Sequence, residues 1–268
     1  MSGAEFLRLA WDWRPSVIAG CCALLLGYAG AARFRFGARS CFWAAGVLAI
    51  FFVLASPLDA LADHYLFSVH MAKHILFVLI VPALLLMGLP APPVRRAVRM
   101  RAIARIERFL SQPVVAWAAG VGAMVVWHIP AVFNRALASE PLHIIEHLSL
   151  LVCGTIYWWP ILSPLPEARM KPVPQGAAYL FTACLACTAI GIAVTFAPGL
   201  LYPAYAHPED IYGISTLIRN GWGISPHMDQ QIGGILMWAP ACLVYLTGIM
   251  AMFARWYSEE VNAALEAP

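Results

Sequence analysis

The stretch that decides the fold is Asp63–Pro90, DHYLFSVHMAKHILFVLIVPALLLMGLP. Its apolar part is long enough for a helix that crosses a bilayer, which takes about 20 apolar residues. His70 and His74 stand four residues apart in its first half, so a helix places both imidazoles on one face. Imidazoles are costly in lipid and need partners inside the protein. The stretch therefore predicts a membrane-spanning helix that carries a polar site.

The composition extends this reading to the whole chain of 268 residues. Hydrophobic residues make up 62% and charged residues 12%, whereas an average soluble domain is about half apolar and about a quarter charged. We therefore predict an all-α, polytopic integral membrane protein with seven transmembrane helices, in which residues 1–268 form a single transmembrane helical domain. The predicted spans are about 15–32, 40–55, 66–88, 113–133, 142–162, 176–197 and 229–253.

The positive charges set the expected orientation. Seven spans place the first, third and fifth links on the same side as the C-terminus, and that side holds twelve of the seventeen Lys and Arg residues. They are Arg33, Arg35, Arg39, Arg95, Arg96, Arg99, Arg101, Arg105, Arg108, Arg169, Lys171 and Arg255. Because cytoplasmic loops are enriched in Lys and Arg, we predict the N-terminus outside and the C-terminus in the cytoplasm. We expect the arginines of Arg95–Arg108 to lie along an anionic lipid surface.

With this orientation, all eight histidines fall in the outer half. His143 and His147 repeat the spacing of His70 and His74, and His128 stands near the outer end of the preceding span. Two helices that each offer two imidazoles at similar depth can hold a metal ion with three or four nitrogens. We predict a metal site at His70, His74, His128, His143 and His147. Candidate additional ligands or outer partners are His64, Met71, Glu146, His227, Met228 and Asp229.

The residue types leave several kinds of site open. Imidazole binds zinc, copper, iron and nickel, and the thioethers of Met71 and Met228 favour copper. A haem iron held by two histidines from different helices is the main alternative. His143–His147 also matches the HxxEH pattern of zinc peptidases, but two ligands and one glutamate do not define an enzyme, and we expect none here. The remaining alternative is a metal-free protein whose histidines serve packing alone.

Three stretches resemble a known family. They are SPLDALADHYLFSVHMAKHILFVLIVPALLLMGLP (56–90), WHIPAVFNRALASEPLHIIEHLSLLVCGTIYWWPIL (127–162) and DQQIGGILMW (229–238). Together with the seven-span layout they are similar to the CtaG family of assembly factors for the caa(3)-type cytochrome c oxidase. The resemblance covers most of the chain, from Ser56 to Trp238.

The resemblance implies an assembly factor for a haem–copper cytochrome c oxidase. It implies that the five histidines bind a copper ion at the outer face and that the ion is delivered to the catalytic subunit of the oxidase. The implied partners are the haem–copper oxidase subunits, the lipid bilayer and a periplasmic copper donor, and we expect no nucleic acid. The expected location is the bacterial cytoplasmic (inner) membrane, crossed several times. A haem-binding or electron-transfer membrane protein and a metal-free assembly scaffold are the alternatives.

Overall fold

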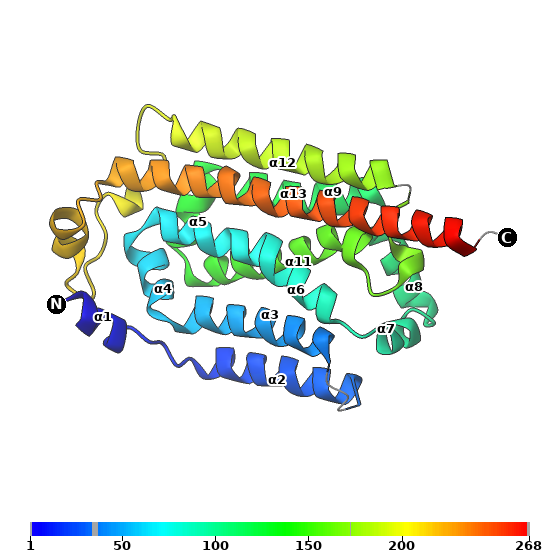
Figure 1. The fold of residues 1–268 in the computed structure, drawn as a ribbon. Coiled ribbons are helices and arrows are strands. Elements are labelled where there is room, and N and C mark those ends of the chain that lie inside the picture. Colours follow the sequence, from blue (N-terminus) through cyan, green and yellow to red (C-terminus); the bar gives the residue numbers. More distant parts are fainter. Residues whose placement is uncertain (1, 34–36, 172, 267–268) are drawn as a thin grey trace.

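In a computed structural model, residues 2–33, 37–171 and 173–266 form helices joined by links, with no strand in these ranges (Figure 1). Arg35, one of the arginines used to predict the orientation, lies outside the described residues. Five helices are long and apolar enough to cross a membrane, and a sixth is added if the bent pair Arg101–Leu110 and Pro113–Trp127 counts as one span. The prediction of an all-α protein with several membrane-spanning helices is therefore confirmed.

The α-helices follow one another along the chain with few long links. They are α1 (Gly3–Leu9), α2 (Pro15–Ala31), α3 (Ala38–Ala55), α4 (Pro57–Ala60), α5 (Phe67–Ile75), α6 (Val81–Gly88), α7 (Ala91–Ala97), α8 (Arg101–Leu110), α9 (Pro113–Trp127), α10 (Pro130–Leu137), α11 (Glu140–Leu162), α12 (Val173–Thr195) and α13 (Pro226–Glu266). Shorter π-helical or 3₁₀ turns lie between them: η1 (Leu61–Tyr65), η2 (Leu76–Ile80), η3 (Pro166–Ala168), η4 (Pro203–Tyr205) and η5 (Leu217–Gly221).

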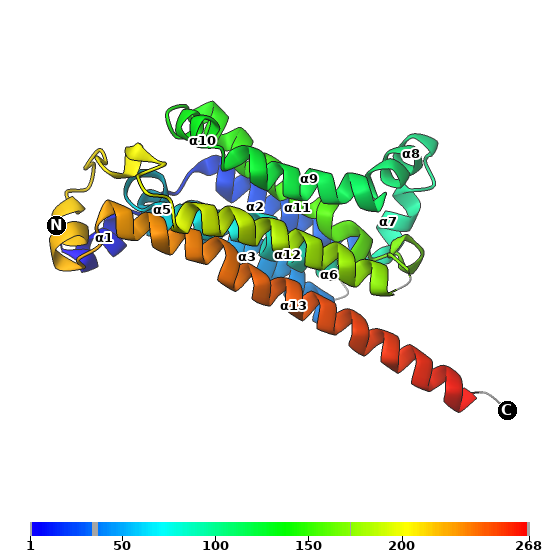
Figure 2. The same cartoon turned by 90° about the horizontal axis from the view of Figure 1, so that it is seen from above.

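The span that contains the quoted stretch lies at the centre of the bundle. α5, η2 and α6 join into one continuous helix, Phe67–Gly88, which is the most buried of the candidate spans. α3 packs against α6, α11 packs against α6 and η2, and α13 packs against α5. α2 lies outside α3, and α12 and α13 run side by side (Figures 1 and 2). The central position of this span explains why its imidazoles are shielded from lipid.

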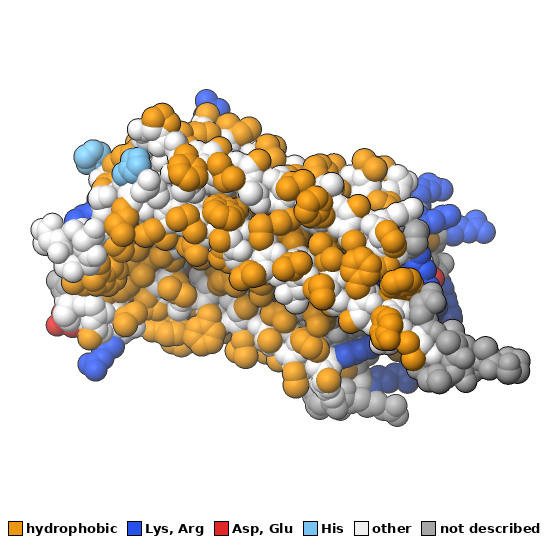
Figure 3. Space-filling view, turned by 45° about the horizontal axis from the view of Figure 1, so that its top comes forward, with side chains coloured by type: hydrophobic (Ala, Val, Ile, Leu, Met, Phe, Trp, Pro, Cys, Tyr) orange, Lys and Arg blue, Asp and Glu red, His pale blue; other side chains and the backbone are white. Residues whose placement is uncertain are grey.

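The two ends of the bundle differ in charge. α7 and α8 lie at one end, and α1, α4 and the long segment 196–225 lie at the other (Figures 1 and 2). Hydrophobic side chains cover most of the face seen in Figure 3, and Lys and Arg side chains gather at the α7–α8 end. α8 separates an apolar side from an arginine-bearing side, as expected for a helix at a lipid–water boundary.

A proline explains the π turn in the middle of the central span. Pro82 has no N–H for the carbonyl oxygen of Val78, four residues earlier, and the wider turn of η2 accommodates its ring. Gly154 of α11 packs directly on this carbonyl, because a Cβ at Gly154 would lie 2.5 Å from the Val78 oxygen. The close approach of α11 to the central span lies two helical turns from His147.

We therefore expect Gly154→Ala to destabilise the fold by about 1–3 kcal/mol, since backbone atoms must move apart to admit one methyl group. The thermal unfolding midpoint of the detergent-purified protein would measure this loss. Gly27→Ala is the matched control, because a Cβ at Gly27 of α2 meets nothing within 4 Å. Equal midpoints for the two variants would contradict this account of the helix contact.

Two predicted spans have different ends in the structure. The prediction that a helix covers 113–133 is wrong, because α9 ends at Trp127 and α10 begins at Pro130. Pro130 cannot donate a backbone hydrogen bond, and it restricts Ile129, which has an extended conformation. The last span was predicted as 229–253, whereas α13 extends from Pro226 to Glu266. The remaining predicted spans agree with the observed helices to within about three residues.

Candidate metal centre

Four buried side chains from two helices bring their donor atoms together near the α1–α4 end of the bundle. α5 contributes His70 and His74, and α11 contributes Glu146 and His147. One ligand atom from each lies within 4.8 Å of those from the other three. His70, His74 and Glu146 have no exposed surface. We call these four residues the deep group.

Hydrogen-bond partners indicate which nitrogen carries the hydrogen in three of the imidazoles, those of His128, His74 and His70. His128 Nδ1 donates to the Met124 carbonyl oxygen at 2.6 Å, which leaves its Nε2 as an acceptor. His74 Nδ1 lies 3.4 Å from that Nε2 and donates to it, so His74 Nε2 carries a lone pair. His70 Nδ1 lies 3.3 Å from the Ala62 carbonyl oxygen, and donation there leaves a lone pair on His70 Nε2. We assign these tautomers from the hydrogen-bond partners.

With this assignment, two lone pairs face each other in the deep group. His70 Nε2 and His74 Nε2 are 2.9 Å apart, and a Glu146 carboxylate oxygen lies 3.3 Å from the His74 nitrogen. Among the described residues, neither Glu146 oxygen nor His147 Nε2 has a hydrogen-bond partner. Buried polar atoms without partners are rare and costly. A cation or a proton between these atoms would remove the cost.

His128 and Met71 border the deep group. His128 follows the last residue of α9, and its Nε2 lies 3.2 Å from the Met71 sulfur as well as 3.4 Å from His74. The break at Pro130 thus leaves His128 at a helix end, where its ring reaches toward α5. His128 therefore lies next to the deep group and orients the ring of His74.

A second set of donors lies beside the deep group. Asp63 of η1, His70 and His143 of α11 also place one ligand atom each within 4.8 Å of one another. His143 Nε2 lies 3.7 Å from Asp63 Oδ1, and His70 Nδ1 lies 3.9 Å from the same oxygen. The Asp63 and His143 side chains are 18% and 16% exposed, whereas that of His70 is 0% exposed. We call these three residues the shallow group.

A buried chain of ion pairs adjoins the shallow group. Lys73 Nζ donates to Asp59 Oδ1 at 2.7 Å and to Asp63 Oδ1 at 2.6 Å. Arg14 pairs with the other oxygen of Asp59. Lys73 and Asp59 are almost completely buried, so water screens their attraction little. These pairs fix η1 and α4 against α5 and hold Asp63 beside the histidines.

Hydrogen bonds from three tyrosines hold the segment 196–225 against η1 and the end of α9, so that this segment covers the site. Tyr205 donates to the Ala62 carbonyl oxygen at 2.8 Å, and Tyr202 donates to the His128 carbonyl oxygen at 3.0 Å. Tyr65 donates to Asp210 at 3.1 Å, and burial raises the pKa of its hydroxyl to about 12, so it remains a donor at neutral pH. Sequence reasoning missed this cover because no periodic pattern marks an irregular segment.

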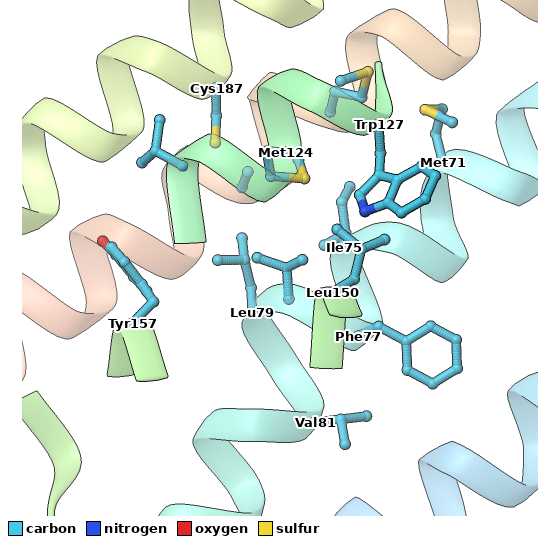
Figure 4. Packing of buried hydrophobic residues seen from close by; sticks show 14 of the residues in the cluster. Met71, Ile75, Phe77, Leu79, Val81, Met124, Trp127, Leu150, Tyr157 and Cys187 are labelled. Atoms are coloured by element: carbon cyan, nitrogen blue, oxygen red, sulfur yellow. The ribbon is translucent and has the colours of Figure 1, made fainter. Parts of the chain in front are cut away.

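Apolar side chains separate the site from the rest of the membrane core. The ring of Phe77 lies 5.3 Å from that of His147, and the ring of Phe133 lies 5.0 Å from that of His70. Phe77 belongs to the main hydrophobic core together with Ile75, Leu150 and Trp127 (Figure 4). The donor atoms are therefore enclosed by apolar groups on the membrane side, and electrostatic interactions there are strong.

The structure brings together most of the residues proposed from the sequence. His70, His74 and His147 meet in the deep group, His143 lies in the shallow group, and His128 is adjacent. Glu146, expected as an additional ligand or outer partner, belongs to the deep group itself. Met71 contacts His128.

Other candidates lie elsewhere or have a different role. The side chains of His64, His227 and Met228 are exposed and take no part in the buried donor groups. Asp229 is buried, but its two oxygens accept the backbone N–H groups of Phe67 and Ser68 at 2.7 and 3.0 Å. From a neighbouring helix, Asp229 therefore accepts backbone N–H groups in the first turn of α5 that have no partner within the helix, as an N-terminal cap does. Asp63 was not predicted as a site residue.

Comparisons with known proteins find a matching family and similar proteins. Residues 24–259 match the family described as cytochrome c oxidase caa3 assembly factor. The chain is similar to an uncharacterized protein of Mycobacterium leprae (25% identity over 285 residues) and to one of Mycobacterium bovis (24% identity over 281 residues). These matches cover 97% and 96% of this chain but 42% and 41% of the relatives, so the chain spans about two fifths of their length.

No solved structure matches the chain. The family match includes both donor groups, from Asp63 to His147, and every helix from α3 to α12. Because that match covers most of the chain, the protein belongs to the family of cytochrome c oxidase caa3 assembly factors.

Proposed function

We propose that the protein binds a copper ion as cargo in the deep group and delivers it to the catalytic subunit of a haem–copper oxidase. The observation that carries this proposal is the convergence of buried lone pairs. His70 Nε2 and His74 Nε2 face each other at 2.9 Å, and Glu146 and His147 offer further donor atoms without partners. Three imidazoles and a carboxylate are a suitable ligand set for a transition metal.

The packing of the imidazoles favours a single ion over a haem. The ring centroids of His70 and His74 are 4.5 Å apart, and those of His74 and His147 are 5.7 Å apart. Two axial ligands of a haem must leave a slot for the whole macrocycle between their rings. Phe133 and Phe77 occupy the sides of these imidazoles, so the same arrangement suits a small ion.

Copper fits the chemistry of the site and the role of the family. Copper binds imidazole more tightly than other divalent first-row metals do, and the nearby Met71 thioether suits Cu(I). Cu(I) together with the Glu146 carboxylate would have no net charge, which lowers the cost of holding an ion within a membrane. A ligand set without thiolates releases copper more readily than a cysteine cage, as delivery requires.

The proposed topology has seven spans in the bacterial inner membrane. It adds the 17-residue helix α2 and the 15-residue helix α9 to the five long spans. The cationic α7–α8 end would face the cytoplasm and the metal site the periplasm. A periplasmic donor would then supply copper to the end that holds Asp63 and His143. The protein would act as an assembly factor and not as an enzyme.

A complementation experiment tests delivery in cells. In a strain that lacks this protein, the wild-type chain should restore oxidase activity and the copper content of the purified oxidase, whereas the double variant His70→Ala/His147→Ala should not. The exposed His64 provides the control, since His64→Ala removes an imidazole outside the site. If the double variant restores both activity and copper while present at wild-type level, the metal-free scaffold is the better account.

A further inference from the structure

The two donor groups share one imidazole, and they use its opposite nitrogens. His70 Nε2 faces His74 Nε2 in the deep group at 2.9 Å, whereas His70 Nδ1 faces Asp63 Oδ1 in the shallow group at 3.9 Å. A neutral imidazole has a lone pair on only one of its nitrogens. His70 can therefore serve one group at a time.

Each tautomer of His70 has a hydrogen-bond partner that suits it. With hydrogen on Nδ1, the ring donates to the Ala62 carbonyl oxygen, and Nε2 is free for the deep group. With hydrogen on Nε2, the ring donates to His74 Nε2, and Nδ1 is free for the shallow group. The surroundings support both states, so exchange between them leaves no buried N–H without a partner.

The two groups also differ in access. The side chains of Asp63 and His143 are partly exposed, at 18% and 16%, whereas His74 and Glu146 are completely buried. A cation that reaches the protein from water meets the shallow group before the deep group. His143 Nε2, which has no hydrogen-bond partner among the described residues, also lies 3.9 Å from Glu146, so it stands between the groups.

From these observations we infer that Asp63, His70 and His143 form a second metal position. Copper binds there first, and His70 then transfers it to the deep group. This relay rests on the copper-binding function proposed above. As the ion moves from Nδ1 to Nε2 of His70, one hydrogen leaves Nε2 and one is gained at Nδ1, so the transfer takes up no net proton. The two positions alternate, and one chain holds one ion.

Lys73 competes with an arriving metal ion for the shallow position. Its ammonium group donates to Asp63 Oδ1, the same oxygen that faces His70 and His143. An arriving cation displaces Lys73 from this oxygen, and Asp59, 2.7 Å away, continues to bind the ammonium group. The competition keeps copper at the shallow position weakly bound and favours its movement inward.

The relay makes separate predictions for the rate and the strength of copper binding. The probe is Cu(I) presented without oxygen as its coloured bicinchoninate complex to the full-length, detergent-purified chain. Asp63→Asn and His143→Ala should each slow loading about tenfold while weakening affinity less than about threefold, whereas His147→Ala should weaken affinity about 100-fold. Stopped-flow absorbance gives the rate, and equilibrium competition gives the affinity and the number of ions bound.

His64→Ala, next to Asp63 but exposed, is the control and should load at the wild-type rate. The relay is overturned if Asp63→Asn and His143→Ala both load like the wild type, or if His143→Ala weakens affinity as much as His147→Ala does. Two ions bound by one wild-type chain would also overturn the alternation. Failure of the wild-type chain to bind Cu(I) would instead remove the copper-binding function itself, and the relay with it.

Discussion

Replacement of both His70 and His147 by alanine should weaken Cu(I) binding by about 1,000-fold or more, equivalent to about 4 kcal/mol. The two substitutions remove two of the three imidazoles of the deep group and leave Glu146 and His74 as its remaining donors. A carboxylate and a single imidazole provide too few ligands for tight binding in a site closed to water. Competition with a chromophoric Cu(I) chelator measures the affinity.

The matched control removes the same number of imidazoles from exposed positions. His64→Ala/His227→Ala should bind Cu(I) with wild-type affinity, because both side chains lie at the surface. Metal analysis of both purified double variants, after growth in copper, provides an independent comparison. Equal copper content in the two would refute the assignment of the ion to the deep group.

Lys73→Met should destabilise the protein by about 3–5 kcal/mol, the usual cost of removing one partner from a buried ion pair. Methionine fills a similar volume, but it leaves Asp63 without its cation and Asp59 with Arg14 alone. Thermal unfolding in detergent measures the change. Lys171, the other lysine of the chain, is exposed, so Lys171→Met is the matched control.

A second substitution separates lost charge from lost packing. Lys73→Met/Asp63→Asn also removes the carboxylate that Lys73→Met leaves without its cation, so it should recover part of the stability that Lys73→Met alone loses. Such recovery is expected only when charge causes the damage. An unfolding midpoint for Lys73→Met equal to that of Lys171→Met would contradict the buried ion-pair network.

Local spacing explains how much of the site could be predicted from the sequence. His70 and His74, and likewise His143 and His147, lie one helical turn apart, and a helix places such pairs on one face whatever surrounds it. Their similar depth in neighbouring spans then indicates that they meet. The structure confirms that the two pairs approach each other, with their ring centroids 5.3 to 5.7 Å apart across the helix contact.

The rest of the site depends on features that helical periodicity does not describe. Asp63 lies in a π turn before the span, where spacing in multiples of an α-helical turn does not apply. The cover formed by Tyr202 and Tyr205 comes from an irregular segment far along the chain. Asp229 points inward while its neighbours His227 and Met228 point outward, since successive residues of a helix face different directions. Tertiary contacts, and not local pattern, assign these roles.

The π turn at Leu76–Ile80 divides the central span into two parts. The side chains of one part face directions that are not set by the α-helical repeat of the other part. A π turn takes one residue more than an α turn, so the residues beyond it are rotated by about 100° relative to an uninterrupted helix. The half of the helix that carries the histidines and the half that follows the π turn can therefore diverge separately in sequence. Substitutions in α6 that adapt this half to a membrane of different thickness need not change the direction in which the imidazoles of His70 and His74 point.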